Sequence, residues 1–134
     1  MRLVGHCNCG GVKYECDEQP QITALCHCKT CQRQTGSNVS LVVGVKDSAL
    51  RVEGETLGIF VTRGDSGQDV HRSFCTRCGS PIVSRCASIP GIAYIKAGTL
   101  DDTSELKPSA EFHLEDAQPW SPRLEGGLVL ARGT

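Results

Sequence analysis

Nine cysteines in a chain of 134 residues limit what the protein can fold into more than any other feature. Seven of them form three tight groups: Cys7 and Cys9, then Cys26, Cys28 and Cys31, then Cys75 and Cys78. The first ten residues contain no apolar stretch of signal-peptide length, so we expect a reducing, cytoplasmic location. Disulfides do not persist there, and the clusters therefore predict metal ligation rather than a covalent framework.

The spacing within the pairs brings the thiolates of each pair to a common side. In an extended Cys-x-Cys segment both side chains point to the same face, because side chains alternate along a strand with period two. A Cys-x-x-Cys pair does the same on a tight turn, for which Gly79 supplies a permissive backbone. Two pairs make the closed tetrahedral shell of a structural zinc. We assign four cysteines to that site: Cys7, Cys9, Cys75 and Cys78.

The middle group, Cys26, Cys28 and Cys31, offers three sulfurs and no obvious fourth ligand. Three protein ligands and one open position are typical of a catalytic zinc. The sequence therefore predicts two zinc ions per chain, one structural and one catalytic. Two structural ions are an alternative, whereas simple burial of the thiols does not explain the paired spacings.

Other ligand sets are compatible with the same spacing. Cys7 and Cys9 could join two of the middle cysteines, and His71 or His113 could supply a fourth ligand. His27 is a poor ligand for the middle site, because in an extended segment it faces away from the cysteines on either side of it.

The two remaining cysteines, Cys16 and Cys86, fit best as small apolar core residues. Cys16 lies near the end of a predicted strand and is an alternative redox partner.

The length and composition indicate one small, mainly β domain spanning residues 1–134. Short apolar or alternating runs bounded by turn residues predict strands at 12–16, 22–26, 37–45, 50–53, 57–63, 70–74, 82–85, 92–97 and 110–114. Residues 29–35 predict a short helix beside the middle cysteines, stopped by Gly36. Periodicity is lost after about residue 121, which predicts a partly ordered tail. Only 4% of the residues are aromatic, so bound zinc would supplement a thin core.

Composition also excludes some functions. The formal net charge is -1 and no long basic run is present, so no nucleic-acid partner is expected. The longest uninterrupted apolar run covers residues 41–45, far short of the roughly 20 residues that span a bilayer, so no membrane association is expected.

Three motifs together resemble those of the glutathione-dependent formaldehyde-activating enzyme family, which also includes centromere protein V. They are Gly5-x-Cys7-x-Cys9-Gly10-Gly11-Val12-x-Tyr14, Cys26-His27-Cys28-x-x-Cys31-Gln32-Arg33-x-Thr35-Gly36-Ser37, and Arg72-Ser73-Phe74-Cys75-x-x-Cys78-Gly79-Ser80. The resemblance extends from Gly5 to Trp120.

The resemblance implies a β-tent fold of antiparallel sheets, shared with methionine-R-sulfoxide reductases. It implies a structural zinc held by the four paired cysteines and a catalytic zinc held by the middle three. It also implies addition of the glutathione thiol to formaldehyde, which gives S-hydroxymethylglutathione and is classed as a carbon-sulfur lyase reaction.

An open zinc site of this kind needs balancing charge. Three thiolates and Zn²⁺ carry one net negative charge, and an incoming thiolate adds another, so positive or donor groups should lie nearby. Gln32 and Arg33 are the predicted substrate-binding residues, and neighbouring Lys29 fits better as a solvated surface charge. Two rival functions remain: a two-zinc binding module without turnover, and a thiol-dependent reductase on the same fold, for which only Cys16 and Cys86 are available.

Overall fold

The computed structural model describes residues 2–131 and is mainly β. Its strands are β1 (Leu3–His6), β2 (Lys13–Cys16), β3 (Ile22–Cys26), β4 (Ser40–Lys46), β5 (Leu50–Glu53), β6 (Leu57–Arg63), β7 (Asp69–Cys75), β8 (Pro81–Cys86), β9 (Ile92–Lys96), β10 (Ala110–Phe112) and β11 (Leu128–Val129). The helical elements are α1 (Lys29–Thr35) and the short 3-10 turns η1 (Asp47–Ala49), η2 (Ala97–Thr99) and η3 (Leu114–Asp116). The predicted fold class is confirmed. Within the described residues no helix is both long and apolar enough to cross a bilayer.

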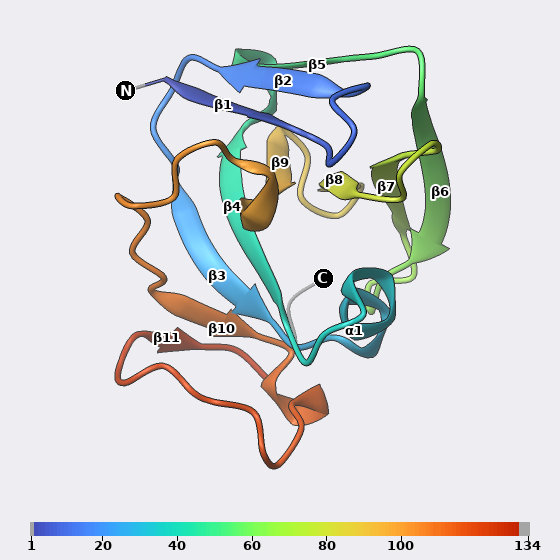
Figure 1. The fold of residues 1–134 in the computed structure, drawn as a ribbon. Helices are drawn as coiled ribbons and strands as arrows, with labels where there is room; N and C mark the ends of the chain where they lie inside the picture. Colours follow the sequence, from blue (N-terminus) through green and yellow to red (C-terminus); the bar gives the residue numbers. More distant parts are fainter. Residues whose placement is uncertain (1, 132–134) are drawn as a thin grey trace.

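The strands form two sheets (Figure 1). The small sheet has the order β1-β2-β5, and the large sheet has the order β11-β10-β3-β4-β9-β8-β7-β6. All pairings are antiparallel except those of β10 with β3 and with β11, which are parallel. Strand β11 lies in the segment for which the sequence predicts a partly ordered tail, and Leu128 of β11 pairs with Ala110.

The two faces of the large sheet bury different kinds of side chain, because neighbouring residues on a strand point to opposite faces. One face packs against the small sheet and forms the main apolar core, which includes Val43, Val45, Val83, Ala93 and Ile95. The other face carries the residues that alternate with these, namely Val42, Ser84, Tyr94 and Lys96, together with Arg72 of β7. This second face is unusual because it buries two basic side chains, Arg72 and Lys96, whereas such side chains are mostly exposed in folded proteins.

Helix α1 has the bounds that the sequence predicts, and both of its ends are capped. The Cys31 backbone N–H donates to Cys28 Sγ at 3.1 Å, which satisfies one of the free N–H groups of the first turn. Gly36 ends the helix with φ of 65°, a left-handed conformation that glycine adopts readily. The caps hold Cys28 and Cys31 in a fixed relation.

Most predicted bounds agree with the structure to within one residue, but two strand ends differ by more and one strand was not predicted. Strand β4 begins at Ser40 rather than at residue 37, because the Ser37 N–H still bonds the Gln32 carbonyl of the helix cap. Strand β10 ends at Phe112 because His113 has φ of 54°, which breaks the extended chain. Strand β1, with only four residues, was not predicted.

Candidate metal centres and the pocket beside one of them

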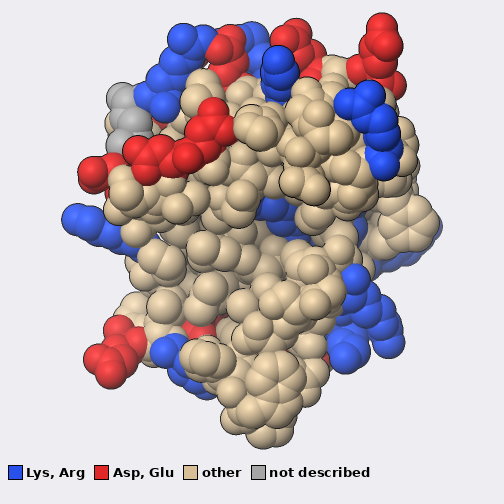
Figure 2. Space-filling model, in the orientation of Figure 1, with Lys and Arg blue, Asp and Glu red and all other residues tan. Residues whose placement is uncertain are grey.

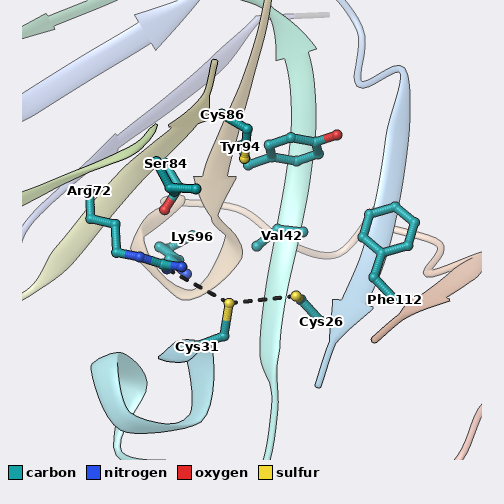
Figure 3. A pocket seen from close by; sticks show the side chains of 10 residues that line it. Cys26, Cys31, Val42, Arg72, Ser84, Cys86, Tyr94, Lys96 and Phe112 are labelled. Carbon is teal, nitrogen blue, oxygen red and sulfur yellow. Dashed lines mark hydrogen bonds between the residues drawn. The ribbon is translucent and has the colours of Figure 1, made fainter. Parts of the chain in front are cut away.

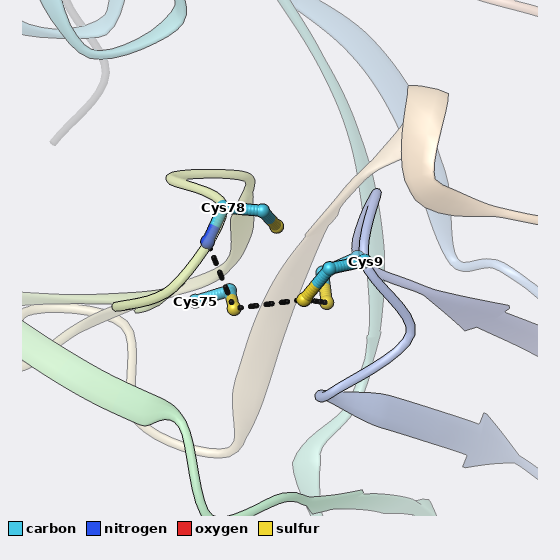
Figure 4. Close-up of side chains that lie close together, drawn as sticks. Cys9, Cys75 and Cys78 are labelled. Carbon is cyan, nitrogen blue, oxygen red and sulfur yellow. Dashed lines mark hydrogen bonds between the residues drawn. The ribbon is translucent and has the colours of Figure 1, made fainter.

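The first cysteine cluster connects the loop after β1 of the small sheet to the turn after β7 of the large sheet. The Sγ atoms of Cys7, Cys9, Cys75 and Cys78 all lie within 4.8 Å of one another. Cys9 follows β1, whereas Cys75 and Cys78 surround the turn after β7, and Figure 4 shows the two segments facing each other. The sulfur of Cys9 is 3.6 Å from that of Cys7 and 3.7 Å from that of Cys75.

Local turns orient these thiols. The turn at Cys75–Cys78 is the one that the spacing predicts, whereas Cys7 and Cys9 lie on a turn instead of the predicted extended chain, because the Gly10 N–H donates to the Cys7 carbonyl at 3.0 Å. The Gly79 N–H donates to the Cys75 carbonyl at 2.8 Å, and Gly79 has φ of 81°, so the turn uses the conformational freedom of glycine. The Val12 N–H donates to Cys7 Sγ at 3.2 Å, and Arg77 Nε donates to Cys9 Sγ at 3.2 Å. Burial raises the pKa of Cys7, and the hydrogen bond from the Val12 N–H opposes that shift.

The second cluster is formed by Cys26, Cys28 and Cys31, whose Sγ atoms also lie within 4.8 Å of one another. Cys26 is the last residue of β3, Cys28 caps α1 and Cys31 is in its first turn. Cys26 and Cys31 are buried, and their sulfurs are 3.5 Å apart. The cluster is therefore local in sequence but enclosed by the fold.

Thiols packed this closely cannot all ionise alike. Hydrogen bonds from Cys26 and Cys28 lower the pKa of Cys31, and the positive charges of Lys96 and Arg72 act in the same direction. The hydrogen bond to Cys28 raises the pKa of Cys26, and its contact with Cys31 and its burial add to this. The pKa values of Cys26 and Cys31 are therefore shifted in opposite directions, and the positive charges of Lys96 and Arg72 favour the thiolate of Cys31.

Two buried cations face the second cluster, and sequence reasoning missed both. Arg72 on β7 is 7% exposed, and its Nη1 lies 3.7 Å from Cys31 Sγ and 3.0 Å from Gln34 Oε1. Lys96 on β9 is 5% exposed, and its Nζ donates to Ser40 Oγ at 2.8 Å. Burial lowers the pKa of Lys96, while the charge of Cys31 opposes that shift. In residues 2–131 neither cation forms an ion pair with a carboxylate, so the cysteines are their counter-charge.

A pocket of about 40 Å³ lies between the second cluster and the far strands of the large sheet. Figure 3 shows its walls, and its lining residues are Cys26, Cys31, Val42, Val70, Arg72, Ser84, Cys86, Tyr94, Lys96 and Phe112. Figure 2 shows the surface hollowed near the middle of this face, with basic side-chain atoms visible inside the hollow. The pocket therefore combines thiols, two cations and apolar walls.

The predicted substrate-binding residues lie outside this pocket. Gln32 is buried, and its Nε2 donates to the His27 carbonyl at 2.8 Å and the Asp116 carbonyl at 3.0 Å. Arg33 is exposed and lines a separate surface depression that also includes Trp120. Their role in substrate binding stays a prediction.

The histidines do not join either cysteine cluster. Among the described residues, the groups with the spacing and chemistry to hold a metal ion are the two cysteine clusters alone. His27 is buried and its Nε2 lies 3.1 Å from Glu111 Oε1, so it points away from the cysteines that flank it. His71 is exposed on β7, and Nδ1 of His113 is 3.3 Å from Asp65 Oδ2.

Both clusters fit zinc by donor chemistry and by size. Thiolates are preferred zinc ligands, and a Zn–S distance of about 2.3 Å places the sulfurs of a tetrahedron about 3.8 Å apart. Sulfur pairs are separated by 3.6 and 3.7 Å in the first cluster and by 3.5 Å in the second, and all sulfurs of each cluster lie within 4.8 Å of one another. Each cluster could therefore hold a zinc ion with little rearrangement.

Comparisons with known proteins agree with this geometry. Residues 2–116 match a family model described as glutathione-dependent formaldehyde-activating enzyme. The fold is similar to a crystal structure of a Rhodobacter sphaeroides protein, with a TM-score of 0.59 and 22% sequence identity over 78% of this chain and 92% of that chain. No curated protein sequence matches significantly.

Proposed function

We propose that this chain, which belongs to the glutathione-dependent formaldehyde-activating enzyme family, adds a small thiol to formaldehyde or a related small aldehyde. The thiol is glutathione by family membership, the product is an S-hydroxymethyl adduct, and the reaction is of the carbon-sulfur lyase type. The observation that carries the proposal is the second cysteine cluster, which opens onto a small pocket containing two buried cations.

The cysteines divide between two metal roles in this proposal. Four of them would hold a structural zinc, and they are Cys7, Cys9, Cys75 and Cys78. Cys26, Cys28 and Cys31 would hold a second zinc, which leaves one position open. An ion bound there would lower the pKa of an entering thiol, so that the thiol binds as the nucleophilic thiolate.

The buried cations make the second site receptive to one anion. Three thiolates with Zn²⁺ carry one negative charge, and Arg72 and Lys96 together carry two positive charges. The enclosed site would then have one net positive charge before a thiol enters, and a single bound thiolate would neutralise it. In this proposal Arg72 and Lys96 supply the counter-charge, a role for which the sequence suggests Gln32 and Arg33.

The rival functions have less support in the contacts. A reductase needs a reactive cysteine and a resolving partner, but Cys16 is buried in the core between the sheets and Cys86 lines the pocket on the other face of the large sheet. A binding module without turnover would have no use for buried cations facing a thiolate cluster, since their burial costs free energy.

Exchange spectroscopy tests the proposed reaction. The metal-replete protein, at a catalytic concentration, should accelerate NMR exchange between ¹³C-formaldehyde hydrate and its glutathione adduct under conditions where the uncatalysed exchange is slow. Acceleration with cysteine but not with glutathione would change the thiol and keep the reaction. No acceleration with any small thiol would refute the proposal. A predicted cytoplasmic location fits it, because thiols stay reduced there.

A further inference from the structure

We propose that Arg72 and Ser84 bind the carbonyl oxygen of the aldehyde, and that the pocket around them restricts the substrate to aldehydes of one or two carbons. This inference rests on the proposed function. It assigns a role to groups whose placement the cysteine clusters do not explain.

Ser84 is the first supporting observation. It is 6% exposed, and its Oγ has no hydrogen-bond partner within residues 2–131. A buried hydroxyl without a partner loses its hydrogen bonds to water and gains none in return, so such a group calls for an explanation. Figure 3 shows Ser84 on the pocket wall beside Arg72 and Lys96, across the pocket from Cys26. A small bound molecule with an oxygen atom would give this hydroxyl its missing partner.

Arg72 lies directly across from Ser84 and has unused donors. The register pairs Arg72 on β7 with Ser84 on β8, and Ser84 in turn pairs with Tyr94 on β9, so the three side chains lie in one row. The Nε of Arg72 donates to Thr62 Oγ1 at 3.2 Å and its Nη1 contacts Gln34 and Cys31. Its Nη2 has no partner in the part of the chain that the structure describes. A guanidinium held at two of its nitrogens is rigid enough to present the third.

The size of the pocket sets the substrate class. A single water needs roughly 10–15 Å³ of such space, so the pocket of about 40 Å³ accommodates two or three non-hydrogen atoms. Formaldehyde has two and acetaldehyde three. The walls are close-packed: a Cβ at Gly44 would lie 3.3 Å from Cε1 of Tyr94, so the ring lies against the backbone of β4. Phe112 also lines the pocket, and aldehydes of one or two carbons match its volume.

The site would act on the charge that develops during addition. The thiolate sulfur donates an electron pair to the carbonyl carbon, the sulfur–carbon bond forms, and the π pair of the C=O bond moves onto oxygen. That oxygen then takes one proton from water, which matches the proton that the thiol released, so nothing is oxidised or reduced. Donors already aimed at the oxygen stabilise its negative charge without reorganising.

Ser84→Ala and Arg72→Lys test this assignment, with Ser73→Ala as the matched control. Ser73 is also a buried serine, 3% exposed, but it pairs with Val83, whose side chain lies in the core on the other face of the sheet. We expect Ser84→Ala to lower kcat/KM for formaldehyde about tenfold, and Arg72→Lys about a hundredfold, with the metal content and Tm of Ser84→Ala close to those of the wild type. Ser73→Ala should keep wild-type kinetics.

A binding measurement separates this site from the proposed reaction. Formate, with three non-hydrogen atoms and a carboxylate, is the probe, and its dissociation constant can be measured by ¹³C NMR titration. Binding should weaken at least fivefold in Ser84→Ala and Arg72→Lys but not in Ser73→Ala. If the wild type binds formate in this way but catalyses no thiol addition, the oxygen site survives and the proposed function fails. If the wild type is active and both pocket variants keep its kinetics and formate affinity, the oxygen site is refuted while the proposed function stands.

Discussion

Replacing Cys78 by Ser should destabilise the protein far more than replacing Cys31 by Ser. Both changes remove one thiolate from a proposed zinc site, but the sites link very different lengths of chain. Cys9 and Cys75, which share the first site with Cys78, are 66 residues apart in sequence, whereas Cys26 and Cys31 of the second site are 5 apart. The first site also ties the loop after β1 in the small sheet to the turn after β7 in the large sheet.

The loop lengths give the magnitude. If each metal site is treated as a cross-link, closing the loop of 66 residues destabilises the unfolded chain by about 4 kcal/mol, and closing the loop of 5 residues destabilises it by about 2 kcal/mol. At roughly 4 °C per kcal/mol for a domain of this size, loss of the first link should lower Tm by about 16 °C and loss of the second by about 8 °C. Direct metal–sulfur binding makes the first loss larger, because structural zinc contributes on the order of 10 kcal/mol in small metal-dependent folds.

Metal analysis and calorimetry together decide the outcome. Wild-type protein purified without chelator should contain two zinc ions per chain. Cys78→Ser should be poorly soluble or strongly destabilised, whereas Cys31→Ser should stay folded, keep one zinc and lose thiol addition. If Cys31→Ser lowers Tm as much as Cys78→Ser does, the second cluster is structural and the binding-module hypothesis gains. One zinc in the wild type would refute the two-site assignment.

Two further predictions concern residues outside the metal sites. Gly5→Ala should cost about 3 kcal/mol or more and lower Tm in calorimetry, because its new methyl group would overlap the Thr99 carbonyl oxygen; an unchanged Tm would contradict the packing at the edge of the small sheet. For Glu111, burial raises the pKa, but hydrogen bonds from His27 and Arg123 lower it by more, so the folded pKa lies below its ordinary 4.5. The contribution of the Glu111 carboxylate to folding stability is therefore complete above pH 4.5 and is lost as pH falls through the folded pKa. Glu111→Gln should be roughly 3 kcal/mol less stable than the wild type at pH 7, and this stability difference, measured by urea unfolding, should shrink in acid. A stability difference that stays constant with pH would contradict the assignment.

Local features of this protein follow from the sequence alone. The convergence of neighbouring thiols within each Cys-x-Cys or Cys-x-x-Cys segment depends on a few consecutive residues, although Cys7 and Cys9 converge on a turn and not on the predicted extended chain. The meeting of Cys7 and Cys9 with the distant Cys75 and Cys78 depends on the fold. The helix at 29–35 is equally local, because its caps, Cys28 and Gly36, adjoin it. The orientation of His27 away from the flanking cysteines also follows from alternation.

The sequence does not show which distant residues complete the pocket. Arg33 and Lys29 are adjacent to the second cluster in sequence, yet the cations that face it are Arg72 and Lys96, from β7 and β9. The alternation of side chains along β7 predicts the face of the strand on which Arg72 lies, but it does not predict which strand lies beside β7.

Strand register, which is a property of the tertiary structure, determines which side chains line the pocket. Backbone hydrogen bonds place Arg72 opposite Ser84 and Ser84 opposite Tyr94. Because these bonds join backbone groups that are the same in every residue, no side-chain motif predicts the pairing. Burial of two cations is tolerable only where that register also brings them to Cys31, because a cation removed from water needs an opposite charge nearby. Each cysteine motif can be interpreted from its own short segment of sequence, whereas the groups that surround the cysteines in the pocket depend on how all the strands of the large sheet pair.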